Sequence, residues 1–475
     1  MSGVLTGVYF KEAFNYPSRV QIGTMVAILE IGALVSSLIV GRVGDIIGRK
    51  RTICCGATIF VVGGLLQSFA SEMSTLIVGR TISGFGVGFL STIIPVYQSE
   101  ISPPQNRGKL ACIEFTGNIV GYCTSVWVDY ACSFIESNMS WRIPLFFQCI
   151  IGTLLAIGSL VVVETPRWLL NQDHDMEGLE VLAKLYSKGD INSQVARDQF
   201  RDIKDTVILH RLEGEHSYTY MWKRYSKRVL IAMSSQMFAQ LNGINVISYY
   251  APLVFEQAGW VGRSAILMTG INGIIYVLST VPTWYLVDRW GRRRILISGG
   301  LIMCIALVST SYFILLDVAA TPVLVVISVI IYNAFFGYSW GPIPWLYPPE
   351  ILPLSIRAKG ASLSTATNWA FNWLVGLMTP ILQDSMGWAM YLIPAFFCLC
   401  SVNLVYFVFP ETKGVTLEEM DSIFDDKSIT SGVATVHSQE ASEALLGGSS
   451  LPHGSIPQSA AAQARVRSLS TSQHQ

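Results

Sequence analysis

The chain carries one set of charged motifs twice, and the two copies lie roughly half its length apart. In each copy an aspartate stands four residues before the arginine of a Gly-Arg pair, Asp45 before Arg49 and Asp288 before Arg292. Each copy continues with a glutamate seven residues before an arginine and then with a Glu-Thr pair. These are Glu100 with Arg107 and Glu350 with Arg357, followed by Glu164-Thr165 and Glu411-Thr412. The repeat indicates that one structural module has been used twice.

The segments between these motifs are too apolar for an ordinary soluble domain. Of the 475 residues, 51% are hydrophobic and only 13% are charged, and the formal net charge is zero. Apolar runs of about 20 residues, the length that crosses roughly 30 Å of hydrocarbon as a helix, start near Gln21, Thr52, Leu76, Leu110, Arg142, Val229, Gly262, Ile295, Pro322, Ala361 and Trp388. The sequence therefore predicts an all-α multi-pass membrane protein with eleven full spans in a lipid bilayer.

Charge and polarity divide the chain into four units. Arginines and lysines gather in alternate short loops, which assigns those loops and the C-terminus to the cytoplasm. The predicted units are an N-terminal helix bundle (1–163), a cytoplasmic helical linker (164–228), a C-terminal helix bundle (229–410) and a cytoplasmic tail (411–475). The tail is expected to be disordered after about residue 426, because its Ser, Gln, Ala and Gly content cannot form a core.

The first segment is shorter than a membrane span. Residues Ser2 to Phe10 are apolar, but a helix of that length covers only about 14 Å, half of what a crossing needs. Two halves of six spans each require a complete first helix. We therefore expect the first helix to be truncated in this chain, or its remnant to lie in the outer interface of the membrane.

Six short motifs in this order resemble the sugar porter branch of the major facilitator superfamily, and most closely its fungal hexose transporters. The motifs are Gly41-Arg42-Val43-Gly44-Asp45, Pro95-Val96-Tyr97-Gln98-Ser99-Glu100, Glu164-Thr165-Pro166-Arg167, Gln240-Leu241-Asn242-Gly243-Ile244-Asn245, Gly341-Pro342-Ile343-Pro344-Trp345 and Pro410-Glu411-Thr412-Lys413-Gly414. The resemblance covers Met1 to about Phe424. It implies twelve helices in two six-helix bundles, a sugar site between them, and alternating access by rocking of the bundles.

The residues that would bind a sugar are amides and tryptophans within the spans. Amides both donate and accept hydrogen bonds, and a tryptophan ring offers an apolar plate to a sugar's CH face. The resemblance assigns sugar contacts to Gln240, Asn245, Trp345, Asn368 and Trp369, with Asn372 near them and Asn272 as a substitute contact one turn before Tyr276, where the family has Asn. Ala239 and Phe115 depart from the family's glutamines. The alternative is that the amides only hold helices together and the tryptophans only pack.

The acids and arginines of the repeated motifs are the predicted cytoplasmic gate. If the two bundles meet at their inner ends, ion pairs among these residues can latch the outward-open state and break in the inward-open one. The predicted latch residues are Asp45, Arg49, Glu100, Arg107, Asp288, Arg292, Glu350 and Arg357. The alternative is that these arginines only fix the topology.

Energy coupling is predicted to involve Arg80, which lies in an apolar span and should need a counter-charge. In proton-coupled members of the family an Asp in the first helix faces this arginine, and that Asp would precede Met1. Glu30 and Glu114 are the other acids within the spans, and a structural role is expected for both. The chain as written is therefore expected to lack the usual proton coupling.

The sequence thus favours a plasma-membrane carrier of a monosaccharide such as glucose, acting as a monomer, by proton symport in the complete form or by facilitation. The alternatives are a non-transporting sugar sensor and a carrier of a polyol such as inositol or of a disaccharide. No enzymatic activity, cofactor, metal or nucleic-acid partner is expected. An ATP-driven pump is not expected either, because no GxxxxGK[ST] phosphate loop occurs.

Overall fold

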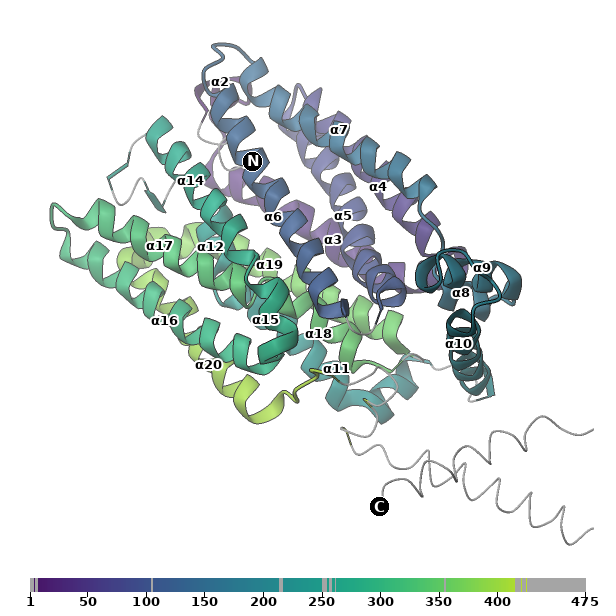
Figure 1. The fold of residues 1–475 in the computed structure, drawn as a ribbon. Helices are drawn as coiled ribbons and strands as arrows, with labels where there is room; N and C mark the ends of the chain where they lie inside the picture. Colours follow the sequence, from purple (N-terminus) through teal and green to yellow (C-terminus); the bar gives the residue numbers. More distant parts are fainter. Residues whose placement is uncertain are drawn as a thin grey trace, which may run out of the picture. The chain divides into compact units, whose positions relative to one another are not determined.

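A computed structural model gives the arrangement of the helices (Figure 1). It describes residues 4, 7–103, 106–212, 217–249, 254–255, 259–260, 262–353, 356–414, 420 and 424. Every regular element among these residues is helical, which confirms the predicted all-α class. The predicted disorder after residue 426 falls outside the described residues.

The first half contributes one short helix and five long ones. They are α2 (Val8–Ala13), α3 (Arg19–Ile47), α4 (Arg49–Ser68), α5 (Met73–Ile101), α6 (Arg107–Cys132) and α7 (Met139–Val161). Three helices then form the connecting segment, α8 (Pro166–Asn171), α9 (Asp175–Tyr186) and α10 (Gln194–Leu212). Figure 1 shows these three together at one end of the molecule, and α8 contacts α5 there.

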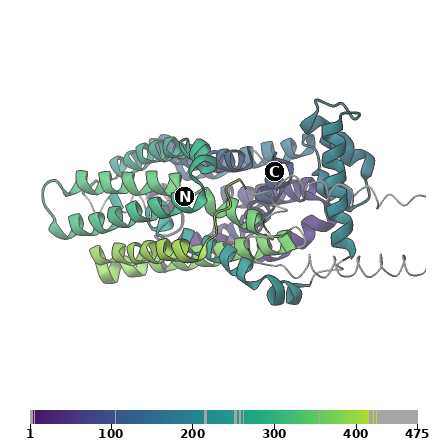
Figure 2. The same ribbon diagram turned by 60° about the horizontal axis from the view of Figure 1, so that its bottom comes forward.

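The second half also contains long helices, but several of them are interrupted, so that it has more and shorter helical segments than the first half. It contains α11 (Tyr218–Leu241), α12 (Ile244–Tyr249), α14 (Arg263–Thr280), α15 (Thr283–Trp290), α16 (Arg292–Leu316), α17 (Thr321–Tyr338), α18 (Ile343–Ile351), α19 (Arg357–Met386), the 3-10 helix η3 (Gly387–Tyr391) and α20 (Leu392–Val408). Figure 2 shows α16 and α17 (green) beside α20 (yellow-green), and all three pack together through α16.

Eight segments of the described chain are helical, long enough and apolar enough to cross a membrane. One of the eight, Arg357–Val408, runs through both α19 and α20, while the long helices α6 and α11 are not among the eight. The chain is therefore a multi-pass membrane protein by length and composition, and the count of eleven full spans stays a prediction.

The first helix in the described part of the chain, α2, is only six residues long. α2 begins at Val8 and packs against α7. Phe10 and Phe14 contact the buried Trp141 of α7, with ring centroids 6.0 and 5.3 Å apart from it. This aromatic contact closes one end of the first half, next to Ala70 between α4 and α5.

Glycines bring α3 and α5 into close contact in the first half. A Cβ atom added to Gly84 would lie 2.2 Å from the Leu29 carbonyl oxygen, and one added to Gly32 would lie 2.5 Å from the Thr81 carbonyl oxygen. Such small residues let membrane helices approach backbone to backbone. The two halves meet mainly where α3 packs on α19 and where α6 packs on α14 and α15.

We predict that Gly84→Ala destabilises the protein, because the added methyl group overlaps the backbone of α3. Overpacking of this kind costs about 1–3 kcal/mol, which will lower the thermal unfolding midpoint of the detergent-solubilised protein. Gly158→Ala is the matched control, since no atom lies within 4 Å of its added Cβ. Equal midpoints for the two variants would contradict the close helix contact.

Candidate functional site

The motif of the first half builds a buried ion pair at the start of α4. The Arg49 guanidinium donates to both carboxylate oxygens of Glu100 in α5, each at 3.1 Å. Asp45, one turn before Arg49, accepts a further contact at 3.1 Å. The Arg49 and Glu100 side chains are only 10% and 2% exposed. Two parallel bonds from one guanidinium to one carboxylate fix the orientation of both groups.

A second glutamate caps the start of the same helix. Glu164, which follows α7, accepts hydrogen bonds from the backbone N–H groups of Arg49 and Lys50, both at 3.1 Å. A carboxylate there satisfies unpaired donors and interacts favourably with the helix dipole. Gly48 has φ +94°, and a Cβ on it would lie 2.4 Å from Glu164 Oε2, so only glycine fits. Burial raises the pKa of Glu164, although the backbone N–H donors favour its charged form.

The second half repeats this arrangement residue for residue. Arg292 pairs with Glu350 at 2.7 Å and with Asp288 at 3.0 Å. Glu411 accepts from the backbone N–H of Arg292 at 2.9 Å. Gly291 has φ +89°, and its Cβ would lie 2.4 Å from Glu411 Oε2. We call each set of Asp, Gly, Arg and two Glu residues an inner joint; the first holds Asp45, Gly48, Arg49, Glu100 and Glu164, and the second holds Asp288, Gly291, Arg292, Glu350 and Glu411.

The arginine–glutamate pairs of the inner joints lie within each half and do not bridge the two halves. The contact that crosses between halves here is made by Asp288, whose carboxylate accepts from the backbone N–H of Lys109 at 3.2 Å, in the first turn of α6. In the other joint, Asp45 lies within electrostatic range of Lys359 in α19. Arg357 donates to the Leu352 carbonyl of its own half. The side chain of Arg107 lies outside the described part of the structure.

Four of the predicted amides form one hydrogen-bonded cluster in the second half. Gln240 Nε2 donates to Asn368 Oδ1 at 2.6 Å, and Asn245 Nδ2 donates to Asn372 Oδ1 at 2.9 Å and to Gln240 Oε1 at 2.5 Å. All four side chains are buried. The turn at Gly243, with φ +99°, ends α11 and returns the chain so that α12 brings Asn245 back onto Gln240. Asn368 and Asn372 lie four residues apart in α19, a spacing that puts them on one helix face.

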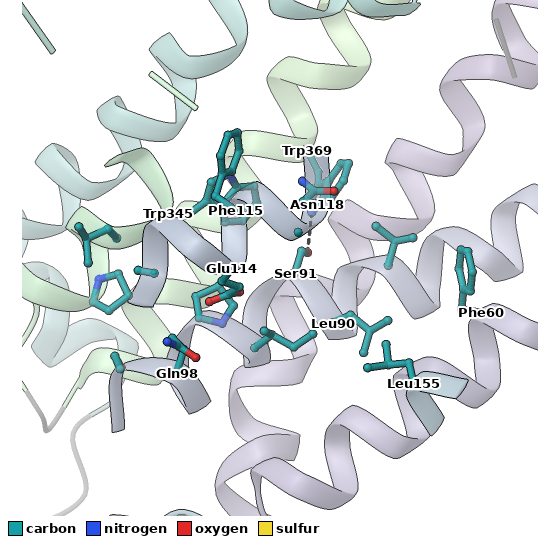
Figure 3. A pocket seen from close by; sticks show the side chains of 18 of the residues that line it. Phe60, Leu90, Ser91, Gln98, Glu114, Phe115, Asn118, Leu155, Trp345 and Trp369 are labelled. Carbon is teal, nitrogen blue, oxygen red and sulfur yellow. Dashed lines mark hydrogen bonds between the residues drawn. The ribbon is translucent and has the colours of Figure 1, made fainter. Parts of the chain in front are cut away.

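The two predicted tryptophans line a cavity of about 650 Å³ (Figure 3). Trp345 extends from α18, just after the Gly341-Pro342 break, and Trp369 from α19. The Trp369 indole donates to Ser91 of α5 at 3.1 Å, which joins the two halves. The amide cluster does not line this cavity. Asn368, a member of the cluster, directly precedes Trp369 in α19. The cluster therefore lies next to the tryptophan that lines the cavity.

Most of the cavity wall comes from α4 to α7 of the first half. Its polar groups include Gln98 of α5 and the pair Glu114 and Asn118 of α6, which Figure 3 shows facing the same space. From the sequence we expected a structural role for Glu114, and Asn118 was not among the predicted site residues. Glu114 and Asn118 stand four residues apart, which puts both on one helix face. This spacing is the sequence signal that could have indicated a polar face on α6.

Two predicted residues lie away from the cavity. Asn272 of α14 is 1% exposed, and its Oδ1 has no hydrogen-bond partner among the residues the structure describes. Arg80 of α5 is buried and donates to the Val26 carbonyl of α3 at 3.0 Å. Glu30 stands one turn after Val26 and is 2% exposed.

Comparisons with known proteins match nearly the whole chain. The profile of the family described as "Sugar (and other) transporter" matches residues 5–424. The high-affinity glucose transporter of Kluyveromyces lactis is 33% identical over 448 residues, which cover 90% of this chain and 81% of that protein. The chain is also similar in structure to the proton:xylose symporter XylE bound to 6-bromo-6-deoxy-D-glucose, with a TM-score of 0.77, 25% identity, and coverage of 89% of this chain and 97% of XylE. Its TM-score to the inward-open conformation of XylE is 0.69, at 26% identity, with 89% and 95% of the two chains covered.

We predict that Glu100→Gln and Glu350→Gln each destabilise the protein strongly, because each removes the buried carboxylate that a buried arginine binds through two hydrogen bonds. Breaking a buried ion pair costs about 3–5 kcal/mol, which thermal unfolding in detergent will measure. Glu180→Gln is the control, since Glu180 and Lys184 pair at 2.7 Å with both side chains more than half exposed, and exposed pairs contribute about 0–1 kcal/mol. If all three variants unfold at the same temperature, the inner joints are not held by their ion pairs.

Proposed function

The chain belongs to the sugar transporter family of the major facilitator superfamily, and on this premise we propose that it carries a monosaccharide across the membrane by alternating access. The observation that carries the proposal is the pair of tryptophans, one from α18 and one from α19, on a cavity whose other wall belongs to the first half. A solute held there contacts both halves, as alternating access requires. The amide cluster does not line this cavity, but Asn368 directly precedes Trp369 in α19, so we place the hydrogen-bonding groups of the sugar site in the adjacent cluster.

The chemistry of the site supports a neutral, hydroxyl-rich solute. The amides of Gln240, Asn245, Asn368 and Asn372 now satisfy one another. A sugar hydroxyl can replace each of these bonds, because it donates and accepts as an amide does. The similar Kluyveromyces lactis protein is named a high-affinity glucose transporter, so we take glucose or a related hexose as the substrate. A polyol, inositol or a disaccharide is the second candidate; a non-transporting sensor is not favoured.

The helix pattern supports eleven full spans. The long apolar segment Arg357–Val408 divides at η3 into α19 and α20, and α6 and α11 are each longer than 20 residues. Counting them separately gives eleven. We propose a plasma-membrane protein with its C-terminal tail in the cytoplasm, acting as a monomer. Transport is by proton symport or by facilitation, and the structurally similar XylE is a proton:xylose symporter.

We place the cytoplasmic latch at the hydrogen bond that Asp288 makes with the other half and at the electrostatic attraction between Asp45 and Lys359. The arginine–glutamate pairs hold each half rigid, and Asp288 reaches from that rigid joint to the first turn of α6. This contact must open for the inner ends to separate.

Hexose uptake tests the function and the site together. In cells without their own hexose carriers, the protein will take up labelled glucose, and Asn245→Ala will raise the KM about fivefold, since one net hydrogen bond contributes about 1 kcal/mol. The control is Asn403→Ala, because the exposed Asn403 of α20 donates to the Leu399 carbonyl of its own helix. If neither the wild-type protein nor Asn245→Ala takes up glucose, while both are present at the cell surface in normal amounts, hexose transport is refuted. Inhibition by excess inositol or a disaccharide would instead identify the second candidate as the substrate.

We predict that Asp288→Asn loosens the latch and exposes the inner end of α6. Cys112 of α6 is 1% exposed and lies near Asp288 and Arg292, so its labelling by a thiol reagent applied from the cytoplasmic side will increase several-fold. Mass spectrometry will resolve this from the labelling of Cys55, which is already exposed. Asp173→Asn, in an exposed pair with Lys204, is the control. If Cys112 is labelled equally in Asp288→Asn and in the wild type, Asp288 is not part of the latch.

A further inference from the structure

One acidic side chain in the cavity is not explained by the inner joints or by the amide cluster. Glu114 of α6 faces the cavity between Gln98 and Trp345 (Figure 3). Within the described chain it takes part in no ion pair and no hydrogen bond. The cavity wall around it is formed largely by apolar side chains such as Leu90, Ile94 and Leu346. A charged carboxylate in such surroundings is costly unless water or a partner stabilises it.

The other charged groups around Glu114 already have partners. Glu350 of α18 is the one other titratable residue that lines the described cavity; it is paired with Arg292 at 2.7 Å and accepts from Thr412 at 2.8 Å. Further described elements packed against α6 carry six charged groups. In α5, Glu100 is bound to Arg49, and Arg80 donates to the Val26 carbonyl. In α15, Asp288 is bound to Arg292, and Arg289 is exposed. Arg142 of α7 donates to the Ala70 carbonyl, and Arg263 of α14 donates to the Ser133 carbonyl. Glu114 is therefore the acid in the cavity that is free to exchange a proton.

We propose that Glu114 is the proton-binding group that couples proton movement to sugar movement. This inference rests on the proposed sugar transport. While the cavity holds water, a charged carboxylate is solvated. A sugar that fills the cavity displaces this water, so the neutral acid becomes the favoured form, and it can donate a hydrogen bond to a sugar hydroxyl. Sugar binding then favours proton binding, and by reciprocity proton binding favours sugar binding by the same factor.

The position of Glu114 along α6 allows its access to change during transport. On one side of it, the Lys109 N–H binds Asp288. On the other side, Thr116 bonds to Thr280 at 2.8 Å and accepts from the Trp284 indole at 2.9 Å. These partners all belong to the second half. When the halves rock, α6 must leave or regain these contacts, and the space around Glu114 then opens to one side of the membrane at a time.

Glucose uptake measured against external pH tests the proposal. For the wild-type protein we expect the KM to fall as the medium is acidified, by up to about tenfold per pH unit for one coupled proton, and an uncoupler to abolish concentrative uptake. In Glu114→Gln, which mimics the neutral acid, the KM will not vary with pH and glucose will not accumulate, but exchange of labelled for unlabelled glucose will continue. Asn118→Ala is the control, because it removes a polar group from the same helix face without removing a titratable one, so its pH dependence will match that of the wild type.

Three outcomes would overturn the proposal, and they differ from failure of the transport function. Glu114→Gln could keep both the pH dependence and the accumulation, or it could lose exchange at a normal surface amount, which would make Glu114 a sugar contact instead. Thirdly, the wild type could transport glucose without moving protons. The third outcome is tested with the wild-type protein alone, by adding glucose to lightly buffered vesicles. Coupled transport shifts the external pH, and transport without such a shift would overturn the proposal. A wild type that moves no hexose would refute the proposed function itself.

Discussion

The structure depends on two buried ion pairs, Arg49 with Glu100 and Arg292 with Glu350. Charges this deeply buried are stable only when paired with good geometry, so each arginine holds the start of one helix against the end of another. The capping glutamates Glu164 and Glu411 act on the same helix starts. The inner joints thereby give each half a rigid inner end. The polar contacts that Asp288 and Trp369 make between the halves are single hydrogen bonds, which are easier to break than these buried ion pairs.

Sequence reasoning identified the parts of these joints but not how they connect. The repeated spacing predicted two equivalent modules, and Gly48 and Gly291 occupy equivalent positions in them. The same pattern of charges is compatible with Arg49 pairing to Glu100 or to Glu350, because loop motifs carry no information on which helix ends meet. The amide cluster was more predictable. Asn368 and Asn372 share a face through their spacing, whereas the turn at Gly243 that brings Asn245 to Gln240 was not foreseen.

Glu114 and the helix that carries it show why the cavity was harder to predict. α6 is one of two long helices outside the segments recognised by hydropathy alone. It is less apolar because it carries Glu114, Thr116 and Asn118, which face the cavity or the other half. A helix that lines a solute pathway must be polar on that face, so the criterion that detects lipid-facing spans is weakest for such helices. Periodicity can place Glu114 and Asn118 on one face, but it does not show what that face meets.

The composition of the first inner joint has a consequence for biosynthesis. Asp45, Arg49, Glu100 and Glu164 are all encoded before the connecting segment of α8 to α10. The nascent chain can therefore complete this joint, and neutralise its most deeply buried charges, before any helix of the second half has been made. Domains whose buried charges are paired within the same domain can fold one after the other as they leave the ribosome. The second half then forms its own inner joint and docks onto a partner that is already folded.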